Sequence, residues 1–130
     1  MRPPVKPSAW RSRVGHVWVD IVIGNPFTSR SVSTRALIDT GATYSVVPRR
    51  VFEELQLPVI GRRSVVTARG SVELDECLGI VEVIGRRAYS HILVSEDVDT
   101  PLIGTVTLEI LGFEVDPITG RLKEAKIFLL

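Results

Sequence analysis

Cysteine and histidine are scarce in this chain of 130 residues. Cys77 is the only cysteine, so an internal disulfide is impossible and a reducing compartment suits the chain. Cys77 lies in an apolar, strand-like run, which favours a packing role over a nucleophilic one. His16 and His91 are the only histidines, and neither has a partner at metal-ligand spacing. We therefore expect no metal and no cofactor.

The chain also lacks an excess of charge of one sign and long apolar runs. The 16 Lys and Arg residues against 15 Asp and Glu leave a net charge of +1, so no basic field predicts a nucleic-acid partner. No segment has the length and apolar character of a signal peptide or a membrane span. We therefore expect a cytoplasmic protein with no membrane partner.

One local charge asymmetry lies at the N-terminus. Arg2, Lys6, Arg11 and Arg13 occur there with no acidic residue among them. Residues 1–13 are predicted to form a flexible, solvated arm. The alternative is an arm that docks on a partner or binds phosphate.

The remaining residues, 14–130, suffice for one domain with a buried core. Apolar and polar residues alternate in several short runs, which is typical of half-buried strands, and two runs have helical spacing. The predicted strands are 14–23, 34–38, 43–47, 64–68, 72–84, 88–94, 113–115 and 122–129. The predicted helices are 48–55 and a second one that ends at Leu111 and is capped by Thr105 or Thr107. The expected fold class is all-β with one or two short helices.

The most informative segment is residues 36–42, with the sequence Ala-Leu-Ile-Asp-Thr-Gly-Ala. It places one carboxylate, Asp39, at the end of an apolar run and inside a tight turn. An ionised carboxylate is costly to desolvate, and Asp is depleted in strands, so its presence here favours a chemical role. The small hydroxyl of Thr40 and the glycine at 41 let another backbone or a substrate come close.

One known chemistry fits such a carboxylate. Hydrolysis of a peptide bond without a metal or a covalent intermediate needs a water molecule held between two carboxylates that share one proton. The chain has a single Asp-Thr-Gly, and its other aspartates lack this setting. If Asp39 is catalytic, its partner must be Asp39 of a second copy, so the mechanism requires a homodimer.

These features resemble the retropepsin-like aspartic proteases, which are the retroviral proteases and their cellular and prokaryotic relatives. Members of this family are dimers, and each chain carries a hydrophobic-hydrophobic-Asp-Thr/Ser-Gly-Ala/Thr motif. The resemblance extends from Val14 onward and includes a later hairpin, a Leu-Ile-Gly element and a C-terminal strand. It implies a closed β-barrel-like retropepsin fold with one lobe per chain. It also implies endopeptidase activity on a peptide or protein substrate.

The resemblance also implies roles for residues of the active-site loop. Asp39 would be the catalytic carboxylate. Thr40 would hydrogen-bond across the dimer, and Gly41, followed by Ala42, would let water and the substrate backbone approach. These roles follow from position in the motif alone.

Two further segments and the C-terminus match by position. A flap closing over the substrate would span 66–72, with four residues proposed to bind substrate: Thr67, Ala68, Arg69 and Gly70. A second loop would be formed by three residues: Leu102, Ile103 and Gly104. Gly104 would pack this loop under the first one. Residues 126–130 would add a strand to the dimer interface.

Several other interpretations remain open on the sequence. A dimeric peptide-binding or assembly module of the same fold would form the same groove without cleavage that depends on Asp39. A monomeric β-domain of unrelated function would form no dimer, and its Asp-Thr-Gly would be an ordinary turn. Arg69 at the expected flap tip is interpreted as a solvated charge or as a substrate contact.

Overall fold

The computed structural model describes residues 16–130, so the predicted arm at 1–13 lies outside the described residues. In the described part, the strands are β1 His16–Gly24, β2 Ser31–Asp39, β3 Ser45–Pro48, β4 Val59–Thr67, β5 Gly70–Val83, β6 Arg86–Ser95, β7 Leu102–Ile103, β8 Phe113–Val115 and β9 Leu122–Glu124. The helices are α2 Arg49–Leu55 and α3 Thr105–Leu111. The expectation of a mostly β chain with two short helices is confirmed.

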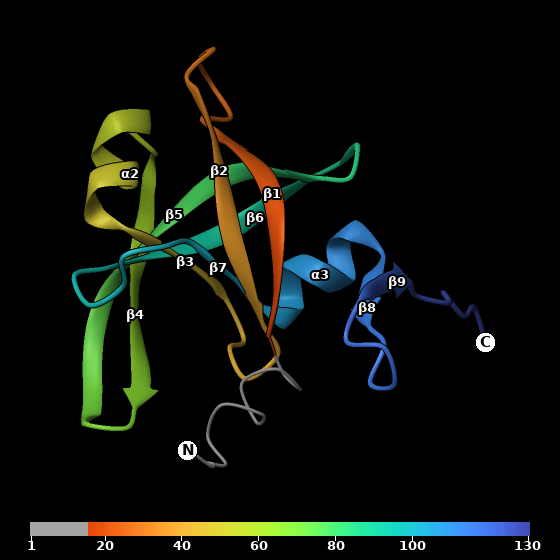
Figure 1. The fold of residues 1–130 in the computed structure, drawn as a ribbon. Helices are drawn as coiled ribbons and strands as arrows, with labels where there is room; N and C mark the ends of the chain where they lie inside the picture. Colours follow the sequence, from red (N-terminus) through yellow and green to blue (C-terminus); the bar gives the residue numbers. More distant parts are fainter. Residues whose placement is uncertain (1–15) are drawn as a thin grey trace.

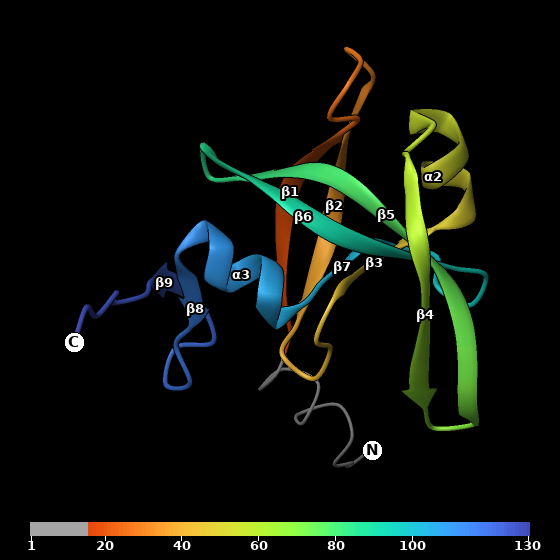
Figure 2. The same ribbon diagram turned by 180° about the vertical axis from the view of Figure 1, so that it is seen from behind.

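Six of these strands form a closed ring (Figures 1 and 2). The order is β1-β2-β7-β3-β6-β5, and β5 pairs again with β1 through four residue pairs, from Ile21 with Val83 to Gly24 with Ile80. Two pairs, β2 with β7 and β3 with β6, are parallel, and the other neighbours in the ring run antiparallel. β4 adds to the outer edge of β5 and extends beyond the ring as a hairpin.

The core lies inside the ring because the strands alternate as the sequence predicts. Along β1, Ile21 and Ile23 are buried, whereas Trp18 and Asp20 are exposed. Cys77 of β5 is fully buried in the same core, and burial raises the pKa of its thiol to about 11. The predicted packing role of Cys77 is confirmed, because a protonated, buried thiol is a poor nucleophile.

Both helix starts differ from the predictions. Pro48, predicted as the first residue of the helix, is instead the N-cap of α2 and the last residue of β3, so α2 begins one residue later than expected. The N-cap of α3 is Gly104, with no side-chain cap, so the predicted capping by Thr105 or Thr107 is wrong. Thr107 instead turns its hydroxyl into the core, where other polar groups bind it. Gly112, with φ of 81°, ends α3 in the left-handed conformation that glycine adopts without strain.

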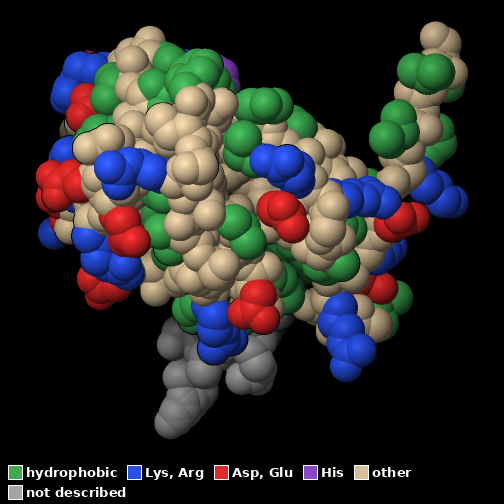
Figure 3. Space-filling model, turned by 90° about the horizontal axis from the view of Figure 1, so that it is seen from above, with side chains coloured by type: hydrophobic (Ala, Val, Ile, Leu, Met, Phe, Trp, Pro, Cys, Tyr) green, Lys and Arg blue, Asp and Glu red, His purple; other side chains and the backbone are tan. Residues whose placement is uncertain are grey.

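Most predicted strand ends differ from the structure by one to three residues, as where β2 begins at Ser31 instead of residue 34, and two differ by five. β4 begins at Val59, not at residue 64, because a register shift between Val59 and Gly61 accommodates the glycine within the strand. The predicted last strand, 122–129, ends at Glu124. Its partner β8 has three residues, so the pairing ends there, and Ile127 to Leu130 are exposed. This tail projects from the body of the molecule (Figure 3).

Within residues 16–130, neither helix has the length and apolar composition to cross a membrane. The same residues contain no group of three or more His, Cys, Asp and Glu side chains that could hold a metal ion.

Candidate active site

Asp39 is the last residue of β2, where the strand turns sharply out of the ring. One carboxylate oxygen, Oδ1, accepts a hydrogen bond from the backbone N–H of Gly41 at 2.9 Å, and the carbonyl of Asp39 accepts one from Ala42 at 3.1 Å. The side chain is half-buried, and Thr40 and Gly41 are exposed. A turn of this kind holds the carboxylate at the mouth of the ring instead of in its core.

The Leu-Ile-Gly element lies directly beside this turn. β7 pairs in parallel with β2, Leu37 with Leu102 and Ile38 with Ile103, and antiparallel with β3 through Val46. The strand that ends at Asp39 therefore has β7 on one side and β1 on the other. Two apolar segments far apart in the sequence thus form one floor under the active-site loop.

Gly104 makes the closest approach between the two loops. A Cβ atom at this position would lie 2.6 Å from the carbonyl carbon of Tyr44 and 2.8 Å from the carbonyl oxygen of Thr43. The next two residues, Thr105 and Val106, donate backbone hydrogen bonds to the carbonyls of Ala42 and Thr43, at 2.9 and 3.0 Å. The start of α3 is therefore fastened to the backbone that follows Asp39.

A cluster of three buried hydroxyls supports this junction, and no sequence pattern indicated it. Thr107 lies 2.6 Å from the Ser45 hydroxyl and 2.7 Å from the Ser90 hydroxyl, and the N–H of Gly104 donates to Ser45 at 3.1 Å. All three side chains are buried. A hydroxyl can both donate and accept, so these hydrogen bonds link β3, β6 and α3 through buried polar atoms that have partners.

Removal of the central hydroxyl should destabilise the protein. Thr107→Val keeps the shape of the side chain but leaves Ser45 and Ser90 without this partner in the core, so we expect a loss of about 1–3 kcal/mol in the free energy of unfolding. Thr105→Val, on the same helix but with a hydroxyl outside this cluster, is the matched control and should change it by less than about 0.5 kcal/mol. Urea unfolding measures both, and equal stability of Thr107→Val and the wild type would show that the cluster contributes nothing.

A cleft of about 610 Å³ opens beside the active-site loop. It is lined by residues 41–44 of that loop, by Val46 and Leu93, and by residues 63–66 of β4. A second, more apolar hollow of about 530 Å³ shares Val46 and Val65 with the first and continues toward the hairpin tip. Together they form a groove beside the active-site loop and under the β4–β5 hairpin.

The β4–β5 hairpin is the predicted flap. Thr67 pairs with Gly70, so Ala68 and Arg69 form a two-residue turn, and Gly70 has φ of 115°, which only glycine adopts readily. The Thr67 hydroxyl donates to the Gly70 carbonyl at 2.8 Å. The Arg69 side chain is exposed, and it makes an ion pair with Asp97 at 3.5 Å. Asp97 lies in the loop between β6 and β7, so the tip of the hairpin contacts that loop.

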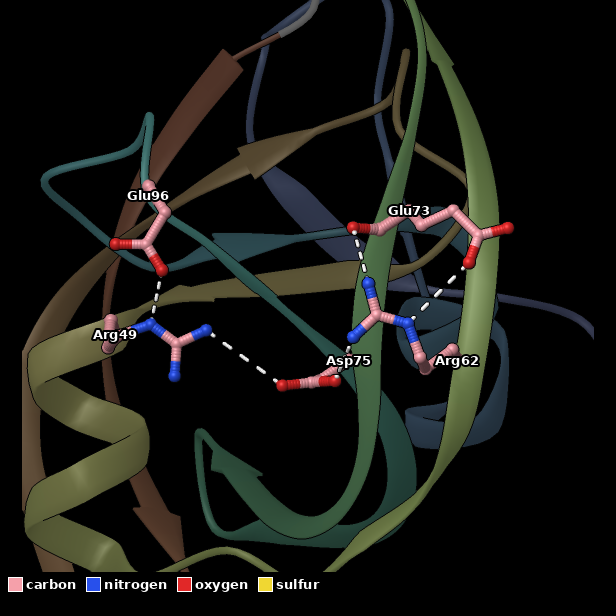
Figure 4. A network of polar contacts seen from close by, with 5 residues as sticks. All are labelled: Arg49, Arg62, Glu73, Asp75 and Glu96. Atoms are coloured by element: carbon pink, nitrogen blue, oxygen red, sulfur yellow. Dashed lines mark hydrogen bonds and ion pairs between the residues drawn. The ribbon is translucent and has the colours of Figure 1, made fainter.

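The stem of the hairpin is joined to the body by ion pairs (Figure 4). Asp75 of β5 lies between two arginines: Arg62 of β4 at 2.8 Å and Arg49 of α2 at 3.8 Å. Arg62 also pairs with Glu73 at 3.5 Å, and Arg49 pairs with Glu96. Exposed ion pairs are individually weak, so this network orients the stem without locking the tip.

A second polar cluster lies at the cleft. Glu76 of β5 is buried, and it pairs with Arg63 of β4 and with His91 of β6. The hydrogen bonds from His91 and Arg63 hold the pKa of Glu76 below its usual range. The Arg63 guanidinium lies 4.9 Å from the centre of the Tyr44 ring, in the active-site loop. The sequence analysis did not identify this cluster.

Comparisons with known proteins identify the class of this fold. A family model described as aspartyl protease matches residues 19–83, which is half of the chain. The chain therefore belongs to the aspartyl protease family. No curated protein matches it.

Two solved structures resemble the chain in fold. The EIAV protease, in complex with the inhibitor HBY-793, is 20% identical with a TM-score of 0.62, over 88% of this chain and 93% of the viral one. The Simian Foamy Virus (mac) protease is 22% identical with a TM-score of 0.54, over 72% and 92%. The predicted retropepsin-like fold is confirmed, as a closed ring of strands.

Proposed function

We propose that this chain is an aspartic endopeptidase that acts as a homodimer, with Asp39 of each copy forming the catalytic pair. The observation that carries the proposal is the position of Asp39. Its carboxylate is held in a tight turn by the N–H of Gly41, the backbone that follows the turn is hydrogen-bonded to the start of α3, and residues 41–44 of the same loop line a cleft beside the β4–β5 hairpin. Membership of the aspartyl protease family and the fold of the retroviral proteases support a hydrolase of peptide bonds.

The proposed mechanism follows from two carboxylates at a two-fold axis. Two carboxyl groups about 3 Å apart share one proton, so the ionised one takes a proton from water and the protonated one donates to the scissile carbonyl. The pair titrates as a unit. In this proposal Thr40 bonds across the dimer, and Gly41 and Ala42 leave space for water and the substrate backbone.

The substrate would bind as an extended strand between the active-site floor and the flap. Leu102, Ile103 and Gly104 support the floor, and residues 67–70 close over the peptide. The exposed Arg69–Asp97 pair contributes little, so it opposes opening only weakly. The residues used here need no cofactor, and a chain with one buried cysteine suits the cytoplasm, where we place it.

The test of the proposal is the dependence of cleavage on protein concentration. Wild-type protein should cleave an unfolded protein substrate between roughly pH 4 and pH 7, where a pair sharing one proton works. Because only the dimer has the pair, the activity per chain should fall as dilution shifts the protein to monomer. Mass spectrometry of the fragments and sedimentation at the same concentrations measure the two quantities.

Three results would contradict the proposal in different ways. Constant activity per chain in samples that sediment as monomers would exclude the shared pair. A dimer that binds peptides and never cleaves them would favour the peptide-binding module. A monomer at every concentration would favour a β-domain of unrelated function.

A further inference from the structure

The cleft beside the active-site loop has one charged side chain in its lining, Arg63 of β4. The other residues that line it are neutral: 41–44, Val46, 64–66 and Leu93. The side chain of Arg63 is 44% exposed, so a molecule in the cleft can reach it. A single charged side chain among neutral lining residues biases the groove toward ligands of complementary charge.

Arg63 is held in one orientation by groups on two sides. Its Nε and Nη2 atoms donate to the two carboxylate oxygens of Glu76, at 3.1 and 3.4 Å. The ring of Tyr44 lies against the guanidinium at 4.9 Å. A guanidinium fixed in this way has already lost side-chain conformational entropy. The entropic cost of binding a ligand to it is therefore lower than for a freely moving arginine.

The guanidinium keeps donors for a ligand. Arginine has five N–H donors, and Glu76 takes one from each of two nitrogens. Nη1 makes no hydrogen bond within the described residues. Glu76 is also hydrogen-bonded to His91, so Arg63 is not its sole side-chain partner. The available edge, Nη1 with the second hydrogen of Nη2, has the geometry that binds a carboxylate with two parallel hydrogen bonds.

We propose that Arg63 is a specificity-determining residue, which selects peptide substrates with an Asp or Glu side chain near the scissile bond. This inference rests on the proposed function. Arg63 lies beside Tyr44, several residues beyond Asp39 in the active-site loop, so the acidic residue flanks the scissile bond and does not adjoin it. A homodimer presents two copies of Arg63, so the preference falls at equivalent positions on both sides of the bond.

The experiment uses peptides that differ at one position. An unfolded protein is first digested with the wild-type enzyme. The sequences around the cleaved bonds then show at which positions acidic residues are enriched. Matched peptides with Glu, Gln or Lys at that position, each made with a free and an amidated C-terminus, are then compared by kcat/KM and by fluorescence anisotropy. We expect the Glu peptide to exceed the Gln peptide by about tenfold, and the Lys peptide to be poorest. A preference that follows the free C-terminus and not the side chain would overturn the inference.

Two variants separate specificity from structure. Arg63→Gln should abolish the difference between the Glu and Gln peptides while cleavage of the Gln peptide continues. Arg62→Gln removes the neighbouring charge of the same strand, which pairs with Asp75 and does not line the cleft, and should keep the preference. If Arg63 only anchored Glu76, its loss would lower the melting temperature and leave the preference unchanged.

Failure of this inference is distinct from failure of the proposed function. A wild-type enzyme that cleaves the Glu and Gln peptides equally well would overturn the role of Arg63 and leave the protease assignment intact. Where the wild type cleaves neither peptide, the anisotropy measurement still decides: equal affinity for both overturns the inference, and tighter binding of the Glu peptide supports it.

Discussion

Asp39→Asn is expected to lower the rate of peptide cleavage by about 10²–10⁴-fold, the range that general acid–base catalysis contributes. The amide cannot take a proton from water, and in the proposed homodimer the change removes both carboxylates at once. The fold should survive, because the amide oxygen of Asn can accept the hydrogen bond that Gly41 donates to Oδ1 at 2.9 Å. Mass spectrometry of fragments and urea unfolding measure the two effects separately.

Asp116 provides a matched control for this substitution. Its Oδ1 accepts a hydrogen bond from the backbone N–H of Ile118 at 2.8 Å, which is the same local geometry two residues along the chain. The turn between β8 and β9 lies on the opposite side of the molecule from the β4–β5 hairpin in Figure 1. Asp116→Asn should therefore keep full cleavage activity. Equal cleavage by wild type and Asp39→Asn would remove Asp39 from the mechanism and point to a contaminating protease.

Mixed dimers test whether the two copies of Asp39 act as a pair. Wild type and Asp39→Asn are unfolded together and refolded, so that the chains combine at random. With a roughly ninefold excess of the variant, about a tenth of the wild-type activity should remain, because most wild-type chains then lie in mixed dimers with one carboxylate. Undiminished activity would mean that a single Asp39 suffices.

The features that the sequence predicted are local ones. A strand with period-two alternation, a two-residue turn with glycine, and an Asp-Thr-Gly after an apolar run each lie within about ten residues, so their pattern is visible without the fold. The β4–β5 hairpin belongs to this class, whereas Leu102 and Ile103 were expected only in a loop and form the short strand β7 because β2 and β3 pair with them.

The features that the sequence did not predict join distant residues. Ser45 and Thr107 lie 62 positions apart, and Ser90 joins them only because β3 pairs in parallel with β6. A serine or threonine in a strand has no local feature that distinguishes a buried hydroxyl partner from a solvated one. The prediction that Thr107 caps α3 failed for this reason, since the core hydroxyls bind it.

The error at the C-terminus has a different physical cause. The composition of residues 122–129 suits a strand, but a strand exists only where a partner offers backbone hydrogen bonds. β8 offers three residues, so β9 stops at Glu124 and the apolar residues after it are exposed. Propensity predicts that a segment can be a strand, and pairing decides where it ends.

Gly104→Ala is expected to destabilise the protein by about 1–3 kcal/mol, the usual cost of overpacking. The backbone of Gly104, with φ of −89°, is ordinary for any residue, so the cost comes from contact and not from conformation. The added methyl group would lie 2.6 to 2.8 Å from backbone atoms of Tyr44 and Thr43, which cannot rotate away as a side chain does. The active-site loop must move instead, and urea unfolding measures the cost.

The displacement should also lower activity by about 10²-fold in samples that remain folded, because catalysis depends on sub-ångström placement of the reacting groups. Two glycines serve as controls. A Cβ atom at position 61 would have no other atom within 4 Å, so Gly61→Ala should have the stability and activity of the wild type. Gly79→Ala meets the flexible end of Ile92 at 2.6 Å, so it should lose stability without losing activity per folded dimer. Equal activity of folded Gly104→Ala and Gly79→Ala would show that the contact between the two loops supports the fold and does not position Asp39.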